Sequence, residues 1–403
     1  MTIILGNYID SNIKSKRGLP SFNPAASNRM LRLAQSLQYV GEETIIVSPA
    51  CAMSMKWTGT LFHKHQKETF SNIEIHYCFA IGLPVIGMLF EQINVILTIG
   101  KLCRKNKIKG LIVYCYYPSS VLASLFAKYI LGITIIEDLE DICVPKISDW
   151  KKNSETNPIQ QIVGWFLMKI MLLISNGVVI PTSKFLYFLK RKDNVVLITG
   201  CIEVPIFDVM QLKTLEMKSI RVLFSGALED ENGVSLLIDF FKLLDRDEEL
   251  SRKFIFDISG HGSKSSFLQN EITIFKNLKI NFHGFLAEDE YTNLLANVKI
   301  ALVLQNPSGR YSNFKTPSKG YEYISNAKTV IVSDIGDFAQ LPRDVLIMLE
   351  SYDSKSLFEI FKNLTLNQIN SISENAYSYS KQNWNSSIVG YKLLEILKKN
   401  NFN

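Results

Sequence analysis

The segment FKTPSKGYEYISNAKTVIVSDIG, residues 314–336, combines residue types that could bind an anion and a sugar. A Thr-Pro pair at 316–317 is typical of the N-cap and first position of a helix, which places Ser318 and Lys319 in the first turn. Free N–H groups and the positive end of the helix dipole attract anions there. Glu322 lies on the same helix face as Lys319 and could hold sugar hydroxyls. The segment fits one end of a nucleotide site, and a capped surface helix with an ordinary ion pair fits it equally well.

Glycines accompany this segment at the ends of other expected strands. Gly226 follows 221–225, His261 lies between two glycines after 254–259, and Gly320 costs its helix about 1 kcal/mol relative to Ala. Each glycine could let a ligand approach the backbone, and each alone is equally explained by a tight turn or, for His261, by an exposed turn residue. Their recurrence, together with the basic residues Arg310, Lys315 and Lys319, favours an anion site in the second half of the chain.

Two features of the first half could face the same site. Gly18 follows the basic stretch KSKRG after the first expected strand, and a glycine-containing loop there could lie at a ligand. The stretch EDLED places four carboxylates in five residues, namely Glu137, Asp138, Glu140 and Asp141. Crowded carboxylates raise one another's pKa and can serve proton transfer. For any one of the four, a solvated acidic loop or a helix-start cap is the simpler explanation.

The elements that must position these residues are alternating apolar runs and helical patterns. In the first half we expect strands at 2–5, 43–48, 73–79, 110–116, 133–138, 177–182 and 194–199. In the second half we expect them at 221–228, 253–260, 279–285, 300–305, 329–334 and 345–349. Nearly continuous apolar strands separated by helices predict an α/β fold with parallel sheets covered on both faces. Ligands of such sheets bind at the carboxyl ends of the strands.

This pattern predicts two Rossmann-like, doubly wound domains that face a cleft. We expect the first domain over 1–202, a linker over 203–220, and the second domain over 221–380. A helical pattern over 381–403 could pack back on the first domain. The chain of 403 residues is long enough for two such cores.

Charge and cysteine usage limit the function classes. Residues 1–200 hold 22 Lys and Arg against 13 Asp and Glu, while the whole chain carries a formal charge of +6. The basic residues are scattered and no zinc-ligand spacing accompanies them, so we expect no nucleic-acid partner and no metal. An anionic substrate or an anionic membrane surface suits the basic half better. The six cysteines have no CxxC spacing, which is typical of reduced thiols in a cytosolic protein.

We expect no signal peptide and no membrane span. The N-terminus MTIILGNYID lacks a basic region and a cleavage site, and is expected to form a strand. The longest apolar run, 162–174, is interrupted by Lys169 and is shorter than the roughly 20 residues needed to cross a bilayer. We expect a core helix there, with contact to a membrane surface as the alternative. The expected location is cytoplasmic, with peripheral contact at the inner face of the cell membrane.

Four motifs in the second half resemble the nucleotide-sugar domain of GT-B glycosyltransferases. They are FSGALEDENGVSLLIDFF, FDISGHGSKSSFL, FHGFLAEDEYTNLLANVKIALVLQ and PSKGYEYISNAKTVIVSDIG, and they keep the order and spacing of that domain over roughly residues 221–340. The sequence is most similar to the retaining enzymes of glycosyltransferase family 4 that build bacterial surface polysaccharides. The resemblance is weaker over 1–200, where it rests on the EDLED segment and VVIPTSKFL at 178–186.

The resemblance implies specific roles. Glu322 would bind the ribose hydroxyls of the donor, Ser318 and Lys319 would lie at its phosphates, and the backbone after Gly226 would line the site. Asp141 falls where such enzymes place a polar residue near the reacting sugar, and it is the candidate catalytic residue. The partners implied are a nucleotide-sugar donor and a glycan or lipid-linked acceptor, with no cofactor and no metal.

The sequence also departs from the family pattern. Where many relatives carry an Arg and a Lys for the diphosphate, this chain has Ala227 and Asn232, and Phe314 replaces a second Glu. Lys319, Arg310 or Lys315 would have to take over the phosphates, unless the donor lies differently or activity is impaired. Two alternatives to a transferase therefore stay open: a nucleotide-sugar epimerase of the same fold, and a non-catalytic partner subunit.

Overall fold

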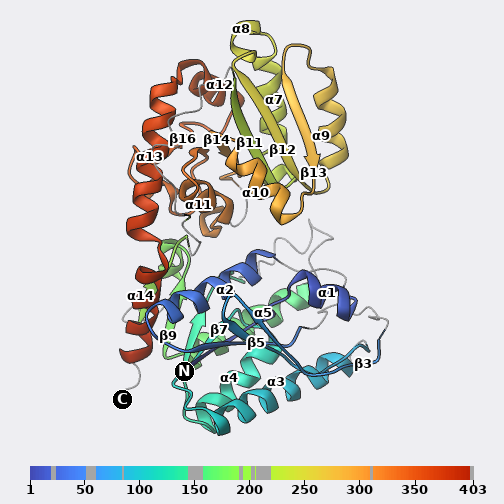
Figure 1. Cartoon of the computed structure of the whole chain (residues 1–403), viewed down its shortest axis with the longest axis vertical. Coiled ribbons are helices and arrows are strands. Elements are labelled where there is room, and N and C mark those ends of the chain that lie inside the picture. The colour runs from blue at the N-terminus through green and yellow to red at the C-terminus, as the bar shows by residue number, and fades with distance from the viewer. Residues whose placement is uncertain are drawn as a thin grey trace. The chain divides into compact units, whose positions relative to one another are not determined.

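The computed structural model describes residues 1–19, 24–50, 60–83, 86–143, 158–189, 194–200, 205, 219–308 and 312–399. Within these ranges the chain forms two compact units (Figure 1). Unit 1 comprises Met1–Cys201 together with Ser386–Asn403, and unit 2 comprises Ile202–Asn385. Most of the expected linker at 203–220 lies outside the described residues.

Unit 1 is built on an eight-stranded sheet of order β10-β9-β8-β7-β1-β2-β5-β4. All pairs are parallel except β4 with β5. Its strands are β1 (Thr2–Leu5), β2 (Thr44–Ser48), β4 (Gln66–Phe70), β5 (Ile73–Tyr77), β7 (Gly110–Tyr114), β8 (Thr134–Asp138), β9 (Gly177–Ile180) and β10 (Val195–Leu197). A small antiparallel pair, β3 (Phe62–His63) and β6 (Ala80–Ile81), lies outside it. The parallel strands are buried on both faces, as their continuous apolar runs predict.

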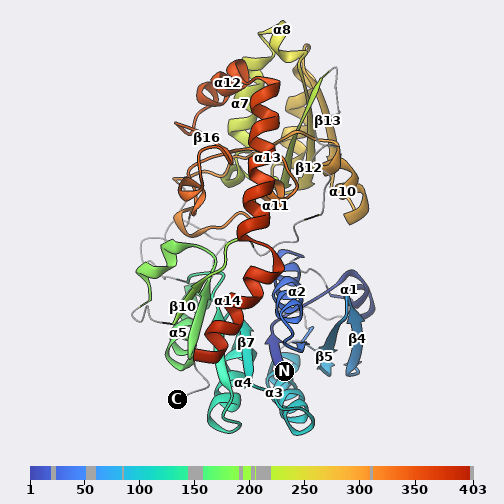
Figure 2. The ribbon, with the colours of Figure 1, turned by 60° about the vertical axis from the view of Figure 1, so that its left-hand side comes forward.

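Helices cover both faces of this sheet. Besides the short α1 (Ser11–Arg17) and the 3₁₀ helix η2 (Ser183–Tyr187), unit 1 has α2 (Pro24–Tyr39), α3 (Ile86–Lys105), α4 (Pro118–Tyr129), α5 (Pro158–Ile174) and α14 (Ser386–Lys399). One core cluster joins α2 and α14 to side chains such as Ile4 and Ile112. The opposite cluster joins α3, α4 and α5 to Ile3 and Val113. Figure 2 shows α14 beside α2 and β10, so the C-terminal helix completes the core of unit 1.

Unit 2 has a six-stranded, entirely parallel sheet of order β13-β12-β11-β14-β15-β16. The strands are β11 (Ile220–Ala227), β12 (Phe254–His261), β13 (Lys279–Gly284), β14 (Ile300–Val303), β15 (Thr329–Val332) and β16 (Ile347–Met348). Phenylalanines dominate the core on one face, with Phe240, Phe241, Phe256 and Phe361 in mutual contact. Every strand expected in this half is present, with ends that differ by a few residues.

The helices of unit 2 lie on both faces of its sheet. The α helices are α7 (Val234–Leu244), α8 (Glu248–Ser251), α9 (Ser265–Glu271), α10 (Glu288–Ala296), α11 (Ser318–Ser325), α12 (Ser354–Asn363) and α13 (Leu366–Asn383). The 3₁₀ turns are η3 (Asp230–Asn232), η4 (Ile272–Ile274), η5 (Ser312–Phe314) and η6 (Phe338–Gln340). Buried side chains of α7, α9 and α12 share one cluster, and those of α10 and α11 share the other. Since α10 and α11 cover the same face, their residues can meet at the sheet's carboxyl edge.

Two expectations about helices are corrected. Gly18 ends helix α1 as its C-cap, with φ 59° and with its N–H donating to the carbonyls of Lys14 and Ser15. The KSKR stretch is therefore helical, and Gly18 is a helix terminator of left-handed conformation, not part of an open loop. The run at 162–174 forms most of α5, but its outward side chains, such as Phe166 and Leu173, are exposed. It is therefore only partly a core helix.

Candidate functional site

The carboxyl ends of β11 and β12 place two glycines side by side. Gly226 pairs in register with Gly260, and a Cβ on Gly260 would lie 1.8 Å from the carbonyl oxygen of Gly226. Gly260 is therefore required by the close approach of the two strands. Gly226 has φ +136°, and a Cβ there would meet nothing within 4 Å. The space beside Gly226 is open, as expected for backbone that a ligand could approach.

His261 is the last residue of β12 and is exposed. Its ring meets Phe285 edge to face, with 5.5 Å between the ring centroids. Phe285 follows β13 and is 71% exposed. The two rings are nearly perpendicular, at 80°, so a planar ring could stack on the face of one of them and meet the edge of the other.

Helix α11 begins one residue later than its sequence predicts. Its N-cap is Pro317 rather than Thr316, and no side chain caps it. Thr316 Oγ1 has no hydrogen-bond partner among the described residues. Ser318 and Lys319 occupy the first turn, as expected. Among the described residues, no side chain caps the first N–H groups of α11, which suits an anion at this helix end.

Lys319, Glu322 and Tyr291 form the charged part of this edge. Lys319 Nζ lies 2.9 Å from Glu322 Oε2 and 3.8 Å from the centroid of the Tyr291 ring, while the Tyr291 hydroxyl donates to Glu322 Oε2 at 3.4 Å. Both charged side chains are partly exposed, at 38% for Lys319 and 31% for Glu322. This geometry therefore fits an ordinary surface ion pair and a ligand-binding site equally well.

Buried hydroxyls support this cluster from below. Ser225 on β11 shares a 2.7 Å hydrogen bond with the Tyr323 hydroxyl and donates to the Tyr291 hydroxyl at 3.5 Å. Burial raises the pKa of Tyr291 and of Tyr323, and the negative charge of Glu322 raises both further. The two phenols therefore stay neutral, and the Tyr291 O–H stays a donor toward Glu322.

The turn after β11 carries acidic residues that pair with nearby lysines. Asp230 lies 2.8 Å from Lys264, and Glu231 lies 2.7 Å from Lys315. The side-chain amide of Asn232 donates to the Ala227 carbonyl at 2.8 Å. The lysines at this edge are thus neutralised by local carboxylates, and phosphate binding would have to exchange these pairs.

Gly320 was expected to let a ligand approach the backbone, but packing against Phe338 explains it. A Cβ at this buried position would lie 2.4 Å from Cζ of Phe338. The Phe338 ring in turn stacks on Tyr321, with 4.8 Å between the centroids. Gly320 lets α11 sit on these rings, so ligand access is not needed to explain it. Arg310 lies outside the described residues.

In unit 1, the carboxylates at the end of β8 surround one arginine. Arg29 of α2 binds both oxygens of Asp138, at 2.9 Å and 2.7 Å, and its Nε lies 2.8 Å from Glu140 Oε1. Burial raises the pKa of Glu140 to about 7, against the lowering effect of Arg29. Glu137 is fully buried on the other face of the sheet, and burial raises its pKa as well. A solvated acidic loop therefore does not describe Glu137 or Asp138.

Asp141 lies two residues after Leu139 and is exposed. Its charge raises the pKa of Glu140, so it lies close to the Arg29 cluster. Together Arg29, Glu140 and Asp141 form a polar edge at the carboxyl end of β8. Whether Asp141 is catalytic stays a prediction.

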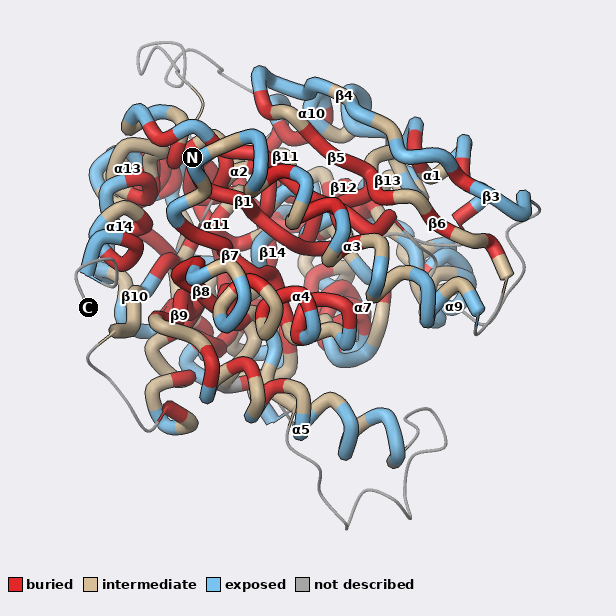
Figure 3. The backbone as a smooth tube through the Cα atoms, turned by 90° about the horizontal axis from the view of Figure 1, so that it is seen from below, coloured by how far each residue is buried: buried red, intermediate tan, exposed pale blue. Residues whose placement is uncertain are grey.

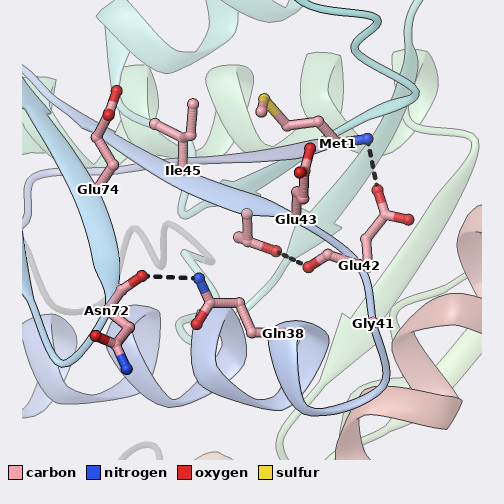
Figure 4. Close-up of a pocket in the computed structure, with 9 residues that line it drawn as sticks. Met1, Gln38, Gly41, Glu42, Glu43, Ile45, Asn72 and Glu74 are labelled. Carbon is pink, nitrogen blue, oxygen red and sulfur yellow. Dashed lines mark hydrogen bonds and ion pairs between the residues drawn. The ribbon is translucent and has the colours of Figure 1, made fainter.

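A pocket of about 470 Å³ lies elsewhere in unit 1, at the amino ends of its strands (Figure 4). Its walls include Glu42, Glu43 and Glu74, and Glu42 binds the N-terminal ammonium group at 2.9 Å. Three carboxylates repel phosphates, and ligands of parallel sheets bind at the other end. Among the described residues, no group of three or more His, Cys, Asp or Glu could hold a metal ion.

The chain matches one protein-family model and several solved structures. Residues 209–383 match the family described as Glycosyl transferases group 1. Comparison with curated proteins gives no match.

Solved structures match over almost the whole chain. Trehalose-phosphate synthase of Burkholderia xenovorans, in complex with glucose-6-phosphate, matches with a TM-score of 0.67 at 11% identity, covering 98% of this chain and 99% of that chain. Sucrose-phosphate synthase of Thermosynechococcus elongatus gives 0.64 at 10%, covering 99% and 98%. The catalytic domain of starch synthase IV of Arabidopsis thaliana, bound to ADP and acarbose, gives 0.65 at 11%, covering 100% and 99%.

These matches confirm the expected GT-B fold of two Rossmann-like units. Residues 209–383, which lie within unit 2, match the group 1 glycosyl transferase model, and the solved structures share the fold of the whole chain.

The sequence did not reveal Tyr291 and Ser225, which lie near Glu322 in unit 2, or Arg29, which lies beside Glu140 in unit 1. Tyr291 contacts Glu322, Arg29 contacts Asp138 and Glu140, and Ser225 reaches Glu322 only through Tyr291, and each lies far from its partner along the chain. Only the strand order and helix packing bring them together. The one hint in the sequence was Ser225, a polar residue within an otherwise apolar strand, which can indicate a buried hydrogen bond.

Proposed function

We propose that the chain transfers a sugar from a nucleotide-sugar donor to a hydroxyl of a glycan or lipid-linked acceptor, with retention, in surface polysaccharide synthesis. The observation that carries the proposal is the cluster of Lys319, Glu322 and Tyr291 at the start of α11, inside the matched group 1 domain. The enzyme would work in the cytoplasm, with peripheral contact to the membrane that holds the acceptor.

Donor binding would separate the Lys319–Glu322 pair. The free N–H groups of α11 and the Lys319 ammonium would turn to the diphosphate, and Glu322 would accept hydrogen bonds from the ribose hydroxyls. The Tyr291 hydroxyl, which already donates to Glu322, would hold the carboxylate in place during this exchange. The exposed His261–Phe285 pair offers a stacking surface for the base.

Transfer would proceed through electrostatic stabilisation of the leaving group. The bond between the anomeric carbon and the phosphate oxygen breaks with oxocarbenium character, and the diphosphate takes the electron pair. Preorganised N–H groups and Lys319 stabilise the developing charge, and no metal is required in this account. The acceptor hydroxyl attacks the anomeric carbon from the same face and passes its proton to the departing phosphate oxygen. In this proposal Asp141 is the polar group nearest the reacting sugar.

The test measures nucleotide release from a panel of nucleotide sugars by wild type and by Glu322→Ala. We expect one donor to be turned over, slowly by hydrolysis without acceptor. Loss of charge-assisted hydrogen bonds at the ribose should lower turnover by about tenfold to a hundredfold. Full activity in Glu322→Ala would contradict the site. Conversion of the sugar without nucleotide release would instead identify an epimerase.

One observation favours a second candidate, a non-catalytic partner subunit. Ala227 and Asn232 replace the basic pair, and Lys264 and Lys315 are bound to local carboxylates. Calorimetry that detects no nucleotide binding at any concentration used would favour this candidate.

A further inference from the structure

The exposed apolar side chains of unit 1 gather on three helices. Among the described residues, α3 exposes Ile86, Met88, Leu89, Phe90, Ile93 and Leu97. Helix α5 exposes Ile159, Ile162, Val163, Trp165, Phe166 and Leu173. Scattered exposed apolar residues are normal on a soluble protein, but a concentration of this kind marks an interaction surface.

On α3 the exposed residues form a single outer stripe. Ile86, Leu89, Phe90, Ile93 and Leu97 recur at intervals of three and four residues, the period of one helix face. The opposite stripe, Val95, Ile99 and Leu102, is buried in the core of unit 1. The helix is thus apolar on both sides, and its outer side has no described partner that would bury it.

Helix α5 repeats this arrangement. Its outer residues Ile159, Ile162, Val163 and Phe166 follow the same spacing, whereas Met168, Met171 and Ile174 are buried. Figure 3 shows exposed positions recurring along α5. Leu173 is 81% exposed, which leaves almost its entire side chain in water.

The two stripes belong to one surface. Helix α4 packs against both α3 and α5, and all three contribute to the same core cluster on one face of the sheet. Lys128 near the end of α4 donates to the Ile174 carbonyl at the end of α5, so these helix ends adjoin. Leu122 and Tyr129 of α4 are also exposed and continue the apolar surface between the stripes. We call it the α3–α4–α5 surface.

Basic residues flank this surface. The outer stripe of α3 continues from Leu97 to Lys101 and Arg104, both exposed, and Lys105 follows. On α5, Lys169 Nζ lies 5.9 Å from the centroid of the Trp165 ring. Within the three helices the sequence holds five basic residues and one acidic residue, Glu91. Lysine and arginine beside Trp, Phe and Leu are typical of helices that lie in the interface of an anionic bilayer.

We propose that the α3–α4–α5 surface docks on an anionic lipid bilayer. The proposal rests on the proposed function in one respect, because a lipid-linked acceptor would give the contact its purpose. Electrostatic attraction of Lys101, Arg104 and Lys105 to anionic headgroups would bring the surface to the membrane, and insertion of the apolar stripes would hold it there.

The helix lies on the membrane in this account and does not cross it. By length and composition, α3 is the one described helix that could span a bilayer. Its inner stripe, however, packs on the sheet together with α4, and leaving that core would expose Ile99 and Leu102. Interfacial binding uses only the stripe that is already exposed.

The direction of the helices relates this surface to the acceptor. Helix α4 starts after the carboxyl end of β7, and α3 ends just before β7 begins. The apolar N-terminal half of α3 therefore lies toward the carboxyl edge of the sheet, and Arg104 lies toward the amino edge. The carboxyl edge of unit 1 also holds Arg29 and Glu140. Arg29 belongs to α2, which covers the opposite face of the sheet, so docking on α3, α4 and α5 would leave this edge open at the side of the bound unit.

The experiment measures sedimentation of the full chain with vesicles of phosphatidylcholine, with and without phosphatidylglycerol. We expect binding to vesicles that contain phosphatidylglycerol, weakened by salt. The double variant Leu89→Gln/Phe166→Gln should bind at least about tenfold more weakly, because two apolar side chains no longer insert. Lys101→Gln/Arg104→Gln should remove most of the preference for the anionic lipid.

The matched control is Phe70→Gln/Leu366→Gln, which changes exposed residues of the same types away from the surface. It should bind vesicles as wild type does. Thermal unfolding shows whether each variant is folded, and nucleotide release is measured separately. Vesicle binding without turnover would contradict the proposed function alone, and turnover without vesicle binding would contradict this proposal alone.

A second copy of the chain is the other occupant to test. If sedimentation equilibrium without lipid shows a wild-type dimer that Leu89→Gln/Phe166→Gln dissociates, the surface is a dimer interface and the proposal is overturned. Wild-type binding by that variant would overturn it too.

Discussion

At the scale of single residues, the chain holds its charges in pairs that a ligand could exchange. Glu322 is shared between Lys319 and Tyr291, and Arg29 is shared between Asp138 and Glu140. Surface ion pairs contribute only about 0–1 kcal/mol each, so breaking one to bind a phosphate costs little. The Arg29 cluster is more buried, and its protonation affects folding stability.

Glu140 makes stability depend on pH in a defined direction. Its pKa of about 7 in the folded chain lies above the usual 4.5, so the folded state binds this proton more tightly than the unfolded state. The stabilisation of the folded state by the Glu140 proton is therefore present at low pH and is lost as pH rises from about 4.5 through 7. We compare the free energy of unfolding of Glu140→Gln with that of wild type at each pH. This difference should be more favourable to the variant at pH 8 than at pH 4, by on the order of 1–3 kcal/mol. Urea unfolding at both values checks this, and an equal difference at both would contradict it.

At the scale of elements, α11 depends on the absence of one side chain. Gly320→Ala places a methyl group against the Phe338 ring, and we expect this overpacking to cost about 1–3 kcal/mol. The substitution should also displace Lys319, and so weaken nucleotide binding beyond the loss of stability.

Gly100→Ala on α3 is the matched control for Gly320→Ala. The nearest atom to its Cβ would be 3.8 Å away, on Phe126, which is an ordinary contact. Alanine should stabilise that helix by about 0.5–1 kcal/mol. Urea unfolding of both variants gives the comparison. A stabilising effect of Gly320→Ala would show that α11 can move away from Phe338 freely.

The elements themselves could largely be predicted from the sequence. Continuous apolar runs such as those of β1, β7 and β14 have the composition of buried parallel strands, and each forms one. The polar strand β4 and the two-residue strands β3 and β6 were missed, because neither composition nor length distinguishes them from loops. The cap of α11 was displaced by one residue, since a Thr-Pro pair permits either start.

The site could be predicted only in part. Lys319 and Glu322 are three residues apart on one helix, so local spacing was enough to pair them. Tyr291 and Ser225 join them only through the packing of α10 and β11, which a single sequence does not reveal. Glu137 and Asp138 end the expected strand 133–138 and do belong to β8, but a solvated loop was left open as the simpler explanation for each carboxylate. A strand buried on both faces also buries its acidic residues.

At the scale of the whole molecule, the chain combines a unit that matches a group 1 glycosyl transferase model with a unit that exposes apolar side chains on α3, α4 and α5. The family match covers residues 209–383, whereas the fold matches extend over almost the entire chain at 9–12% identity. In our proposals, the acceptor and the membrane contact both depend on unit 1, and the donor depends on unit 2.

The most direct measurement of the central claim is thermal unfolding of wild type and Glu322→Gln with UDP, GDP, ADP, CMP and dTDP. A ligand that binds only the folded state stabilises it by about 2.7 kcal/mol at one hundred times its Kd. We expect one nucleoside diphosphate to raise the Tm of wild type selectively, and Glu322→Gln to lose most of that shift. Equal shifts in both proteins, or no shift with any nucleotide, would contradict the claim that this edge of unit 2 binds a nucleotide through Glu322.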